Sequence, residues 1–252
     1  MSLVVRGPVT PASAGWSYVG FEALALHADA PIERETGADE LCIVVLSGRC
    51  AVRSSHGDWQ LGGRPDPFSG MPDAAYLPPR TRYVLEGDAE LALCSAPAGD
   101  GAVARVLSSS EVEPETRGHG AHERTIHPIL MGDREADSLL VCEVLTPAGH
   151  WSSYPPHKHD RDAMPDESFL EETYYHRIRP PQGFALQRVY TGDGTLDETV
   201  TVRDGDVVLV PRGYHTVSAP PGYELYYLNV MAGPVRAWAV ANDPDHEWTL
   251  SP

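Results

Sequence analysis

Two histidines, His157 and His159, stand two residues apart in the stretch WSSYPPHKHD. On an extended strand, residues two apart point to the same face, so both imidazoles are expected to project together. Glu171 and Glu172 open the next strand-like run, and His215 follows the turn sequence VPRGY. Three imidazoles and one carboxylate make a nitrogen and oxygen donor set that suits Zn, Mn, Fe, Ni or Cu. These residues therefore predict a site for one divalent metal ion.

The two neighbouring glutamates cannot both enter a barrel, because adjacent residues on a strand face opposite sides. Glu172, Tyr174 and His176 share one face, which brings one carboxylate and two titratable groups inward together. We therefore prefer Glu172 as the fourth ligand. Glu171, the alternative, is expected on the outer face, where its carboxylate is solvated.

Lys158, between the two histidines, is the only lysine of the chain. Strand alternation turns its side chain away from the ligands, which argues against its acting as the base. We expect a structural role, for example a compact ammonium group held against Asp160 or a backbone carbonyl, where arginine does not fit. A catalytic role, as a mobile lysine that reaches the substrate, is the alternative.

The spacing of turn residues along the rest of the chain is typical of an all-β protein. Its 23 glycines and 23 prolines separate short runs rich in Val, Leu and Tyr, and no long segment keeps a helical period. The expected strands include LCIVVLSG, AAYLPP, YVLEG, FALQRVY, DVVLVPRG and ELYYLNVMAG. Such closely spaced strands are typical of small β-barrels.

Two halves of the sequence resemble each other. DELCIVVLSGRCAV leads to DAAYLPPRTRYVL in the first, and EETYYHR leads through GFALQRVY to GDVVLVPRGYHTV in the second. An internal duplication of one β-unit explains this pattern. The polar segment LSSSEVEPETRG separates the halves, which predicts domains at residues 1-112 and 113-252. The first half has no histidine at the corresponding positions, so we expect the metal in the second domain alone.

Composition limits the partners. The chain has 252 residues, of which 42% are hydrophobic and 22% charged, and no apolar run is long enough for a membrane span. The start, MSLVVRGPVT, has no basic leader or long apolar stretch, so a cytoplasmic protein is expected. The net charge of −17 repels nucleic acid and anionic membranes. Four cysteines without C-x-x-C spacing are expected to be reduced core residues: Cys42, Cys50, Cys94 and Cys142.

The order Gly149, H-x-H, Glu, P-x-G and His, set among paired β-runs, resembles the cupin superfamily. Its small barrels hold a metal with three histidines and one glutamate. Here seven residues rather than five separate Gly149 from His157, and PRGYH is one residue short of the usual pattern. Longer strings in the second half resemble the 5-deoxy-glucuronate isomerase family of bacterial myo-inositol breakdown: GHWSSYPPHKHD, EETYYHRIRPPQGFALQRVY, DGDVVLVPRGYH, YYLNVMAGPVRAW and NDPDHEW.

The resemblance implies an all-β bicupin of two tandem jelly-roll barrels. It also implies an isomerase that converts 5-deoxy-D-glucuronate, a small sugar acid, to 2-deoxy-5-keto-D-gluconate. One divalent ion per chain is expected, with Zn2+ favoured and Mn2+, Fe2+ or Ni2+ as alternatives, because the family is related to a zinc-binding isomerase of pectin breakdown. A homo-oligomer is compatible with the resemblance.

An aldose to ketose isomerisation moves the carbonyl from C1 to C2 through a cis-enediol, so it needs a group that carries the proton. It also needs a divalent ion that stabilises the developing charge and an anchor for the substrate carboxylate. We predict His176 as the proton shuttle, with Tyr174 as the alternative. The metal ligands are then His157, His159, Glu172 and His215.

The predicted anchor is Arg188, with Gln187 as its polar neighbour, and because the two alternate along the strand only one can face inward. Tyr227 and Asn229 share a face of the last long strand and are predicted to line the far wall of the site.

Two other functions stay open on the sequence. A metal-dependent cupin dioxygenase uses the same ligands with iron, and it would consume oxygen with its substrate. A non-enzymatic bicupin that binds a sugar acid for regulation is the second, although the sequence has no DNA-binding helix pair or basic face to support it.

Overall fold

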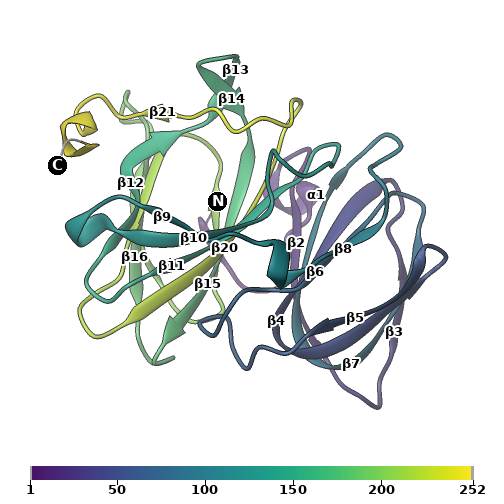
Figure 1. Ribbon diagram of the computed structural model, residues 1–252. Coiled ribbons are helices and arrows are strands. Elements are labelled where there is room, and N and C mark those ends of the chain that lie inside the picture. Colours follow the sequence, from purple (N-terminus) through teal and green to yellow (C-terminus); the bar gives the residue numbers. More distant parts are fainter. Residues whose placement is uncertain (1, 251–252) are drawn as a thin grey trace. The chain divides into compact units, whose positions relative to one another are not determined.

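The protein is built almost entirely of strands in the computed structural model, which describes residues 2–250 (Figure 1). The predicted strand runs lie in β4 (Asp39–Ser54), β6 (Ala74–Leu77), β7 (Arg82–Pro97), β16 (Ala185–Tyr190), β18 (Val207–Val210) and β20 (Glu224–Ala232). The all-β prediction is therefore confirmed. Within residues 2–250, no helix is long and apolar enough to cross a membrane.

The chain forms two compact units that exchange short segments. The first unit contains Gly7–Glu113 and Pro128–Val141, and the second contains the chain up to Arg6, Pro114–His127 and everything from Cys142 onward. The sequence predicted consecutive domains, 1-112 and 113-252. The structure differs from this division at both exchanged segments.

Specific contacts explain each exchange. The strand β1 (Val4–Val5) pairs antiparallel with β18 and so joins the second unit. The buried Glu40 carboxylate accepts backbone N–H groups of Asp137, Ser138 and Leu139 at 2.6–2.9 Å, which fixes that segment to the first unit. Both contacts join residues about a hundred or more positions apart, so local patterns along the sequence do not record them.

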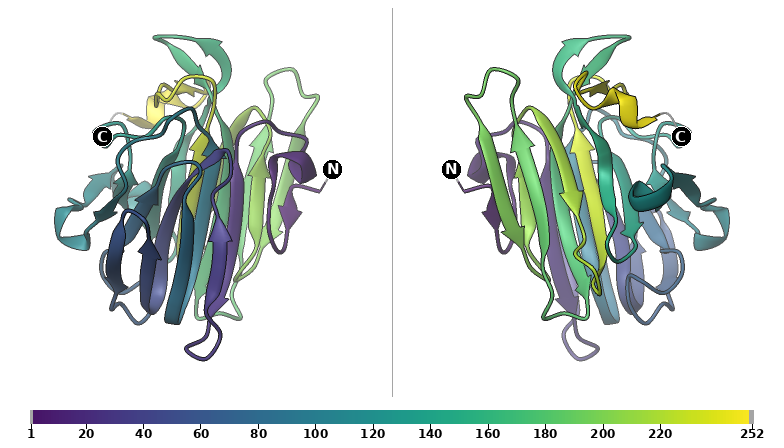
Figure 2. Two further views of the ribbon diagram at one scale, coloured as in Figure 1. Left: turned by 90° about the vertical axis from the view of Figure 1, so that its right-hand side faces the viewer. Right: turned by 90° about the vertical axis from the view of Figure 1, so that its left-hand side faces the viewer.

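The first unit is a sheet in the order β2-β7-β4-β6-β8, with β3 on β7 and β5 on β4. In the side views of Figure 2 its long strands, drawn in blue, run side by side. Gly48 of β4 pairs with Ala89 of the neighbouring strand β7 and has φ of +79°, and a Cβ there would collide with the Asp88 carbonyl oxygen. Glycine fits this position because it has no Cβ and adopts positive φ readily. The remaining elements of this unit are α1 (Pro11–Ala14), β2 (Gly20–Leu26), β3 (Ile32–Glu35), β5 (Gly57–Gly62), β8 (Arg105–Leu107) and η1 (Ser109–Glu111).

Alternating apolar residues of the long strands fill the core of the first unit. Ile43, Val45, Leu85 and Leu91 are fully buried in one cluster. The described part of this unit contains no group of three or more His, Cys, Asp or Glu side chains that could hold a metal ion. All four cysteines of the chain are free and buried, which agrees with their expected place in the core.

The second unit has a seven-stranded sheet, β1-β18-β15-β20-β11-β10-β9, and a five-stranded sheet, β17-β16-β19-β12-β21, with the hairpin β13-β14. Two such sheets are consistent with a jelly roll. The other elements from Glu115 onward are β9 (Glu115–Arg117), η2 (Gly120–His122), β10 (Arg124–Leu130), β11 (Leu140–Thr146), β12 (Trp151–Lys158), β13 (Asp160–Ala163), β14 (Glu167–Phe169), β15 (Glu171–Arg179), β17 (Asp197–Val202), β19 (Tyr214–Ser218), β21 (Ala241–Asn242) and η3 (Glu247–Leu250). Of these, β10 ends and β11 begins inside Pro128–Val141, the segment that is assigned to the first unit.

Strand register brings the candidate site residues together. His157 on β12 lies directly opposite His215 on β19. On the other sheet, β15 and β20 set Tyr174 opposite Asn229, and His176 opposite Tyr227. Directly opposed residues of an antiparallel pair point to the same face, so each of these pairs shares one side of its sheet.

Candidate metal centre

Three histidines of the second unit converge. One ligand atom from each of His157, His159 and His215 lies within 4.8 Å of the others. His159 and His215 are buried, and the Nε2 atom of His157 is buried although the residue keeps some exposed surface. Among the described residues this is the only such group of three or more His, Cys, Asp or Glu side chains.

Backbone carbonyls orient two of these rings. His159 Nδ1 lies 3.0 Å from the Leu170 carbonyl oxygen, and His215 Nδ1 lies 3.3 Å from that of Gly213. A ring that donates from Nδ1 to a carbonyl keeps its Nε2 lone pair for another partner. This is the arrangement that holds metal-binding histidines in the required tautomer.

The Glu172 carboxylate lies against two of these histidines. Its Oε2 lies 3.0 Å from His159 Nε2 and 3.1 Å from His215 Nε2, and its Oε1 accepts a hydrogen bond from Asn229 Nδ2 at 2.6 Å. Burial alone would raise the pKa of Glu172, but the neighbouring His215 and the contact with His159 lower it to about 2. The carboxylate is therefore ionised, which is the form that binds a metal.

The residues present fit a divalent ion. The Nε2 atom of His157 is buried and has no hydrogen-bond partner among residues 2–250, a costly condition that a metal would relieve. Burial and the neighbouring histidines hold the pKa of His157 well below its usual range, so its ring is neutral and able to ligate. Three imidazoles with a neighbouring carboxylate and no thiolate form a donor set that suits a divalent ion such as Zn2+.

Glu171 is also buried, with only 5% of its surface exposed, so the expectation of a solvated carboxylate was wrong. Because β15 is covered on both faces, its outward-facing residues are buried as well. The inward direction of Glu172 agrees with the strand alternation, since Glu172 contacts both His159 and His215.

Tyr174 and His176 follow Glu172 along the inner face of β15. The Tyr174 hydroxyl lies 2.9 Å from Ser153 Oγ, and burial holds the pKa of Tyr174 well above its usual value. His176 Nε2 lies 2.9 Å from Gln187 Oε1, and its Nδ1 is buried with no hydrogen-bond partner in the described part of the chain. Burial lowers the pKa of His176 to about 4, so its imidazole is neutral near pH 7.

Three of the predicted lining residues face inward. Gln187 is fully buried beside His176, Asn229 bonds to Glu172, and the Tyr227 hydroxyl lies 2.6 Å from Ser152 Oγ.

Arg188 does not face the site. Alternation along β16 places Gln187 inside and Arg188 outside, where its guanidinium bonds to the Asp197 carboxylate at 2.8 and 2.9 Å and lies over the Tyr190 ring. Its side chain is 42% exposed. The prediction that Arg188 anchors the substrate carboxylate was therefore wrong.

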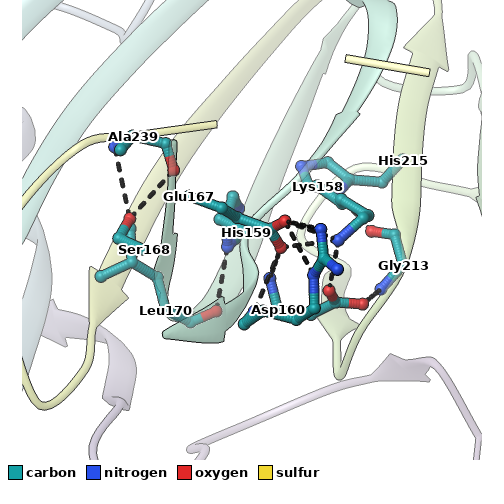
Figure 3. Close-up of polar contacts among 10 residues, drawn as sticks. Lys158, His159, Asp160, Glu167, Ser168, Leu170, Gly213, His215 and Ala239 are labelled. Atoms are coloured by element: carbon teal, nitrogen blue, oxygen red, sulfur yellow. Dashed lines mark hydrogen bonds and ion pairs between the residues drawn. The ribbon is translucent and has the colours of Figure 1, made fainter. Parts of the chain in front are cut away.

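Lys158 points away from the histidines into a cluster of charges (Figure 3). Its ammonium donates to Asp160 at 2.8 Å and to both oxygens of the buried Glu167 at 2.7 and 2.8 Å. Burial opposes the positive charge, but the bonds to Asp160 and Glu167 outweigh burial and raise the pKa of Lys158. A protonated lysine held in this cluster is not a base, and the geometry favours the structural role over the catalytic alternative.

Replacing Lys158 with Met should lower the free energy of unfolding by about 2–4 kcal/mol, because Glu167 would keep a buried charge with one strong partner fewer. Arg117 forms an exposed pair with Glu115, so Arg117→Met should cost less than about 1 kcal/mol. Urea unfolding of both variants measures the difference. Equal losses in the two variants would show that the Lys158 cluster contributes no more than a surface ion pair.

Two residues near the site were missed by the sequence reasoning. Trp238 lies with its ring centroid 6.0 Å from those of both His157 and His159, and Arg124 opens β10 beside the same site. Trp238 lies outside any strand, so no periodic pattern marked it. An arginine at the start of the apolar run RTIHPIL was the available signal for Arg124.

Comparisons with known proteins agree with this architecture. The model of the KduI/IolB family matches residues 4–249. A 5-deoxy-glucuronate isomerase of Geobacillus thermodenitrificans (strain NG80-2) is 55% identical, with 98% of this chain and 91% of the relative covered. The protein of that name from Bacillus subtilis (strain 168) is 44% identical, with 96% and 91% covered.

Solved structures with the same fold support this comparison. The crystal structure of an IolB-like protein from Salmonella typhimurium LT2 matches with a TM-score of 0.97 and 43% identity over 100% of both chains. An oxalate decarboxylase of Lactobacillus farciminis matches with a TM-score of 0.69 at 11% identity, over 96% of this chain and 88% of that one, and so shares the fold alone. The bicupin prediction is confirmed. With nearly its whole length matched, the chain belongs to the KduI/IolB family.

Proposed function

We propose that this chain is a 5-deoxy-glucuronate isomerase, which converts 5-deoxy-D-glucuronate to 2-deoxy-5-keto-D-gluconate. The observation that carries the proposal is the buried group of three histidines and Glu172 in the second unit. The name of relatives that are 44–55% identical supplies the substrate. The reaction is an intramolecular transfer of hydrogen between C2 and C1, so it consumes no second substrate.

The ligands in this proposal are His157, His159, Glu172 and His215, and the ion is Zn2+, which this nitrogen-rich donor set favours. When bound, the ion supplies Lewis-acid stabilisation of the negative charge that grows on the two reacting oxygens. Asn229 positions the Glu172 carboxylate through its hydrogen bond to Oε1.

His176 and Tyr174 have different roles in this proposal because their protonation states differ. His176 is neutral near pH 7 and has a free Nδ1 lone pair, so it can accept the C2 proton and then deliver a proton to C1 of the enediol. Tyr174 keeps its proton and does not act as a base, so its hydroxyl serves as a hydrogen-bond donor to a substrate oxygen. Gln187 holds the His176 ring from the opposite nitrogen.

Turnover under argon tests the function. Protein loaded with Zn2+ should convert 5-deoxy-D-glucuronate without oxygen, and chelation followed by dialysis should abolish the conversion. Turnover that requires oxygen and ferrous iron would point instead to a dioxygenase. If the protein binds the sugar acid but shows no turnover with Zn2+, Mn2+, Fe2+ or Ni2+, it is a sugar-acid-binding protein and not an enzyme.

Elemental analysis of the purified protein should give one divalent ion per chain, because the described part of the chain contains one convergent group of ligands. The double variant His157→Ala, His159→Ala should retain almost none, since it loses two of the proposed ligands. The matched control is His56→Ala with His246→Ala, two histidines that lie outside the group. Two ions per chain, or an ion retained by the first double variant, would contradict the proposed site.

A further inference from the structure

A cavity of about 450 Å³ lies beside the metal centre in the second unit. His157 and Trp238 form part of its wall, so the cavity reaches one of the proposed metal ligands and the indole that packs against two of them. Its volume lies in the range of about 300–1,000 Å³ that is usual for small-ligand pockets. Arg117, His122, Arg124 and Asn242 supply polar groups to the same cavity.

Arg124 has an unusual environment for an arginine in this acidic protein. Its Nη1 donates to the carbonyl oxygens of His122 and Tyr154, both at 3.1 Å. Neither Nε nor Nη2 has a hydrogen-bond partner within residues 2–250, and no carboxylate there lies within ion-pair distance of the guanidinium. The residue is also partly buried.

Burial of a cation without an anion is costly. Burial accordingly lowers the pKa of Arg124 from its ordinary value. The other arginine of the cavity, Arg117, forms an ion pair with Glu115 at 2.7 Å, so its charge is already neutralised. Arg124 is therefore the cation of this cavity whose charge is left for a ligand.

We infer that Arg124 binds the carboxylate of the sugar-acid substrate, while the other end of the substrate lies toward His157 and the metal centre. The two carbonyl bonds hold Nη1 and leave the Nε–Nη2 edge of the guanidinium, which is the edge that forms paired hydrogen bonds with a carboxylate. This inference rests on the proposed function, and it assigns to Arg124 the role that Arg188 does not fill.

The test compares an acid with its neutral amide. Isothermal titration calorimetry measures binding to four Zn2+-loaded proteins: the wild type, Arg124→Gln, Arg124→Lys and the outward-facing control Arg188→Gln. One ligand is 5-deoxy-D-glucuronate that has already been brought to equilibrium with its ketose product. The other is the corresponding mixture of carboxamides. Wild type should bind the acid more tightly than the amide by about 10- to 100-fold, the usual effect of hydrogen bonds between charged partners. Arg124→Gln should remove that preference, because it should weaken the binding of the acid and leave the binding of the amide unchanged.

Arg124→Lys keeps the charge but not the paired geometry, so its preference should be intermediate, and it replaces the glutamine variant if that fails to fold. Arg188→Gln should behave as wild type, because its guanidinium pairs with Asp197 outside the site. An undiminished preference for the acid in both Arg124 variants would overturn the role of Arg124 alone. A wild type that binds neither acid nor amide would contradict the proposed function together with this role.

Discussion

Replacing Glu172 with Gln should lower the affinity for the divalent ion by about 10- to 100-fold or more. The substitution keeps the size of the side chain but removes the charge of a proposed ligand. Mutating a residue that only hydrogen-bonds to a metal ligand typically lowers metal affinity by about 10- to 100-fold, so loss of a ligand's charge should cost at least as much. The hydrogen bond from Asn229 can still form with the amide oxygen. Competition with a chromogenic chelator measures the affinity, and turnover should fall in parallel.

Glu171→Gln is the matched control, because Glu171 has the same chemistry, lies one position away and is also buried. It faces the opposite side of β15, so its substitution should leave the ion in place and affect stability instead. Metal content should therefore be normalised to folded protein. Loss of the ion from the Glu171 variant and its retention by the Glu172 variant would reverse the proposed ligand assignment.

Replacing His176 with Gln should reduce kcat by about 10²- to 10⁴-fold, because an amide cannot accept the C2 proton. Bound Zn2+ should stay at one per chain, since His176 is not among the converging histidines. Exchange of the C2 hydrogen of the substrate with solvent should slow by the same factor. Unchanged exchange with normal metal content would exclude His176 as the acceptor.

The pH dependence of stability gives an independent control for the same variant. The pKa of His176 is lowered to about 4 in the folded protein, below the ordinary value of about 6.5. Between these values the unfolded chain holds a proton that the folded chain does not, so the wild type loses stability as the pH falls. In metal-free protein, the loss between pH 7 and pH 4 should be smaller by about 2–3 kcal/mol in the variant.

The strands and the inward face of β15 could be predicted because they follow the period of two within one segment. His157 with His159, and Glu172 with Tyr174 and His176, each lie on a single strand or beside its end, so alternation alone gives their direction. The facing strands then bring His215 and Asn229 to them.

The failures concern contacts between distant segments. Nothing in the sequence shows that Arg188 has an anion of its own. In the folded chain Asp197 neutralises Arg188, whereas no carboxylate within residues 2–250 pairs with Arg124. The exchanged segments are a similar case, because the Glu40 carboxylate binds backbone groups about a hundred residues away. Trp238 reaches the metal centre from outside the strands, where no period applies.

The most direct test of the isomerase proposal is to incubate the Zn2+-loaded protein with 5-deoxy-D-glucuronate in deuterated water under argon and follow the products by NMR. Proton transfer through His176 predicts 2-deoxy-5-keto-D-gluconate that carries one deuterium on the carbon that was C1 of the substrate. No ketose with any divalent ion would contradict the isomerase, and ketose formed without deuterium would contradict transfer through a side chain that exchanges its proton with solvent.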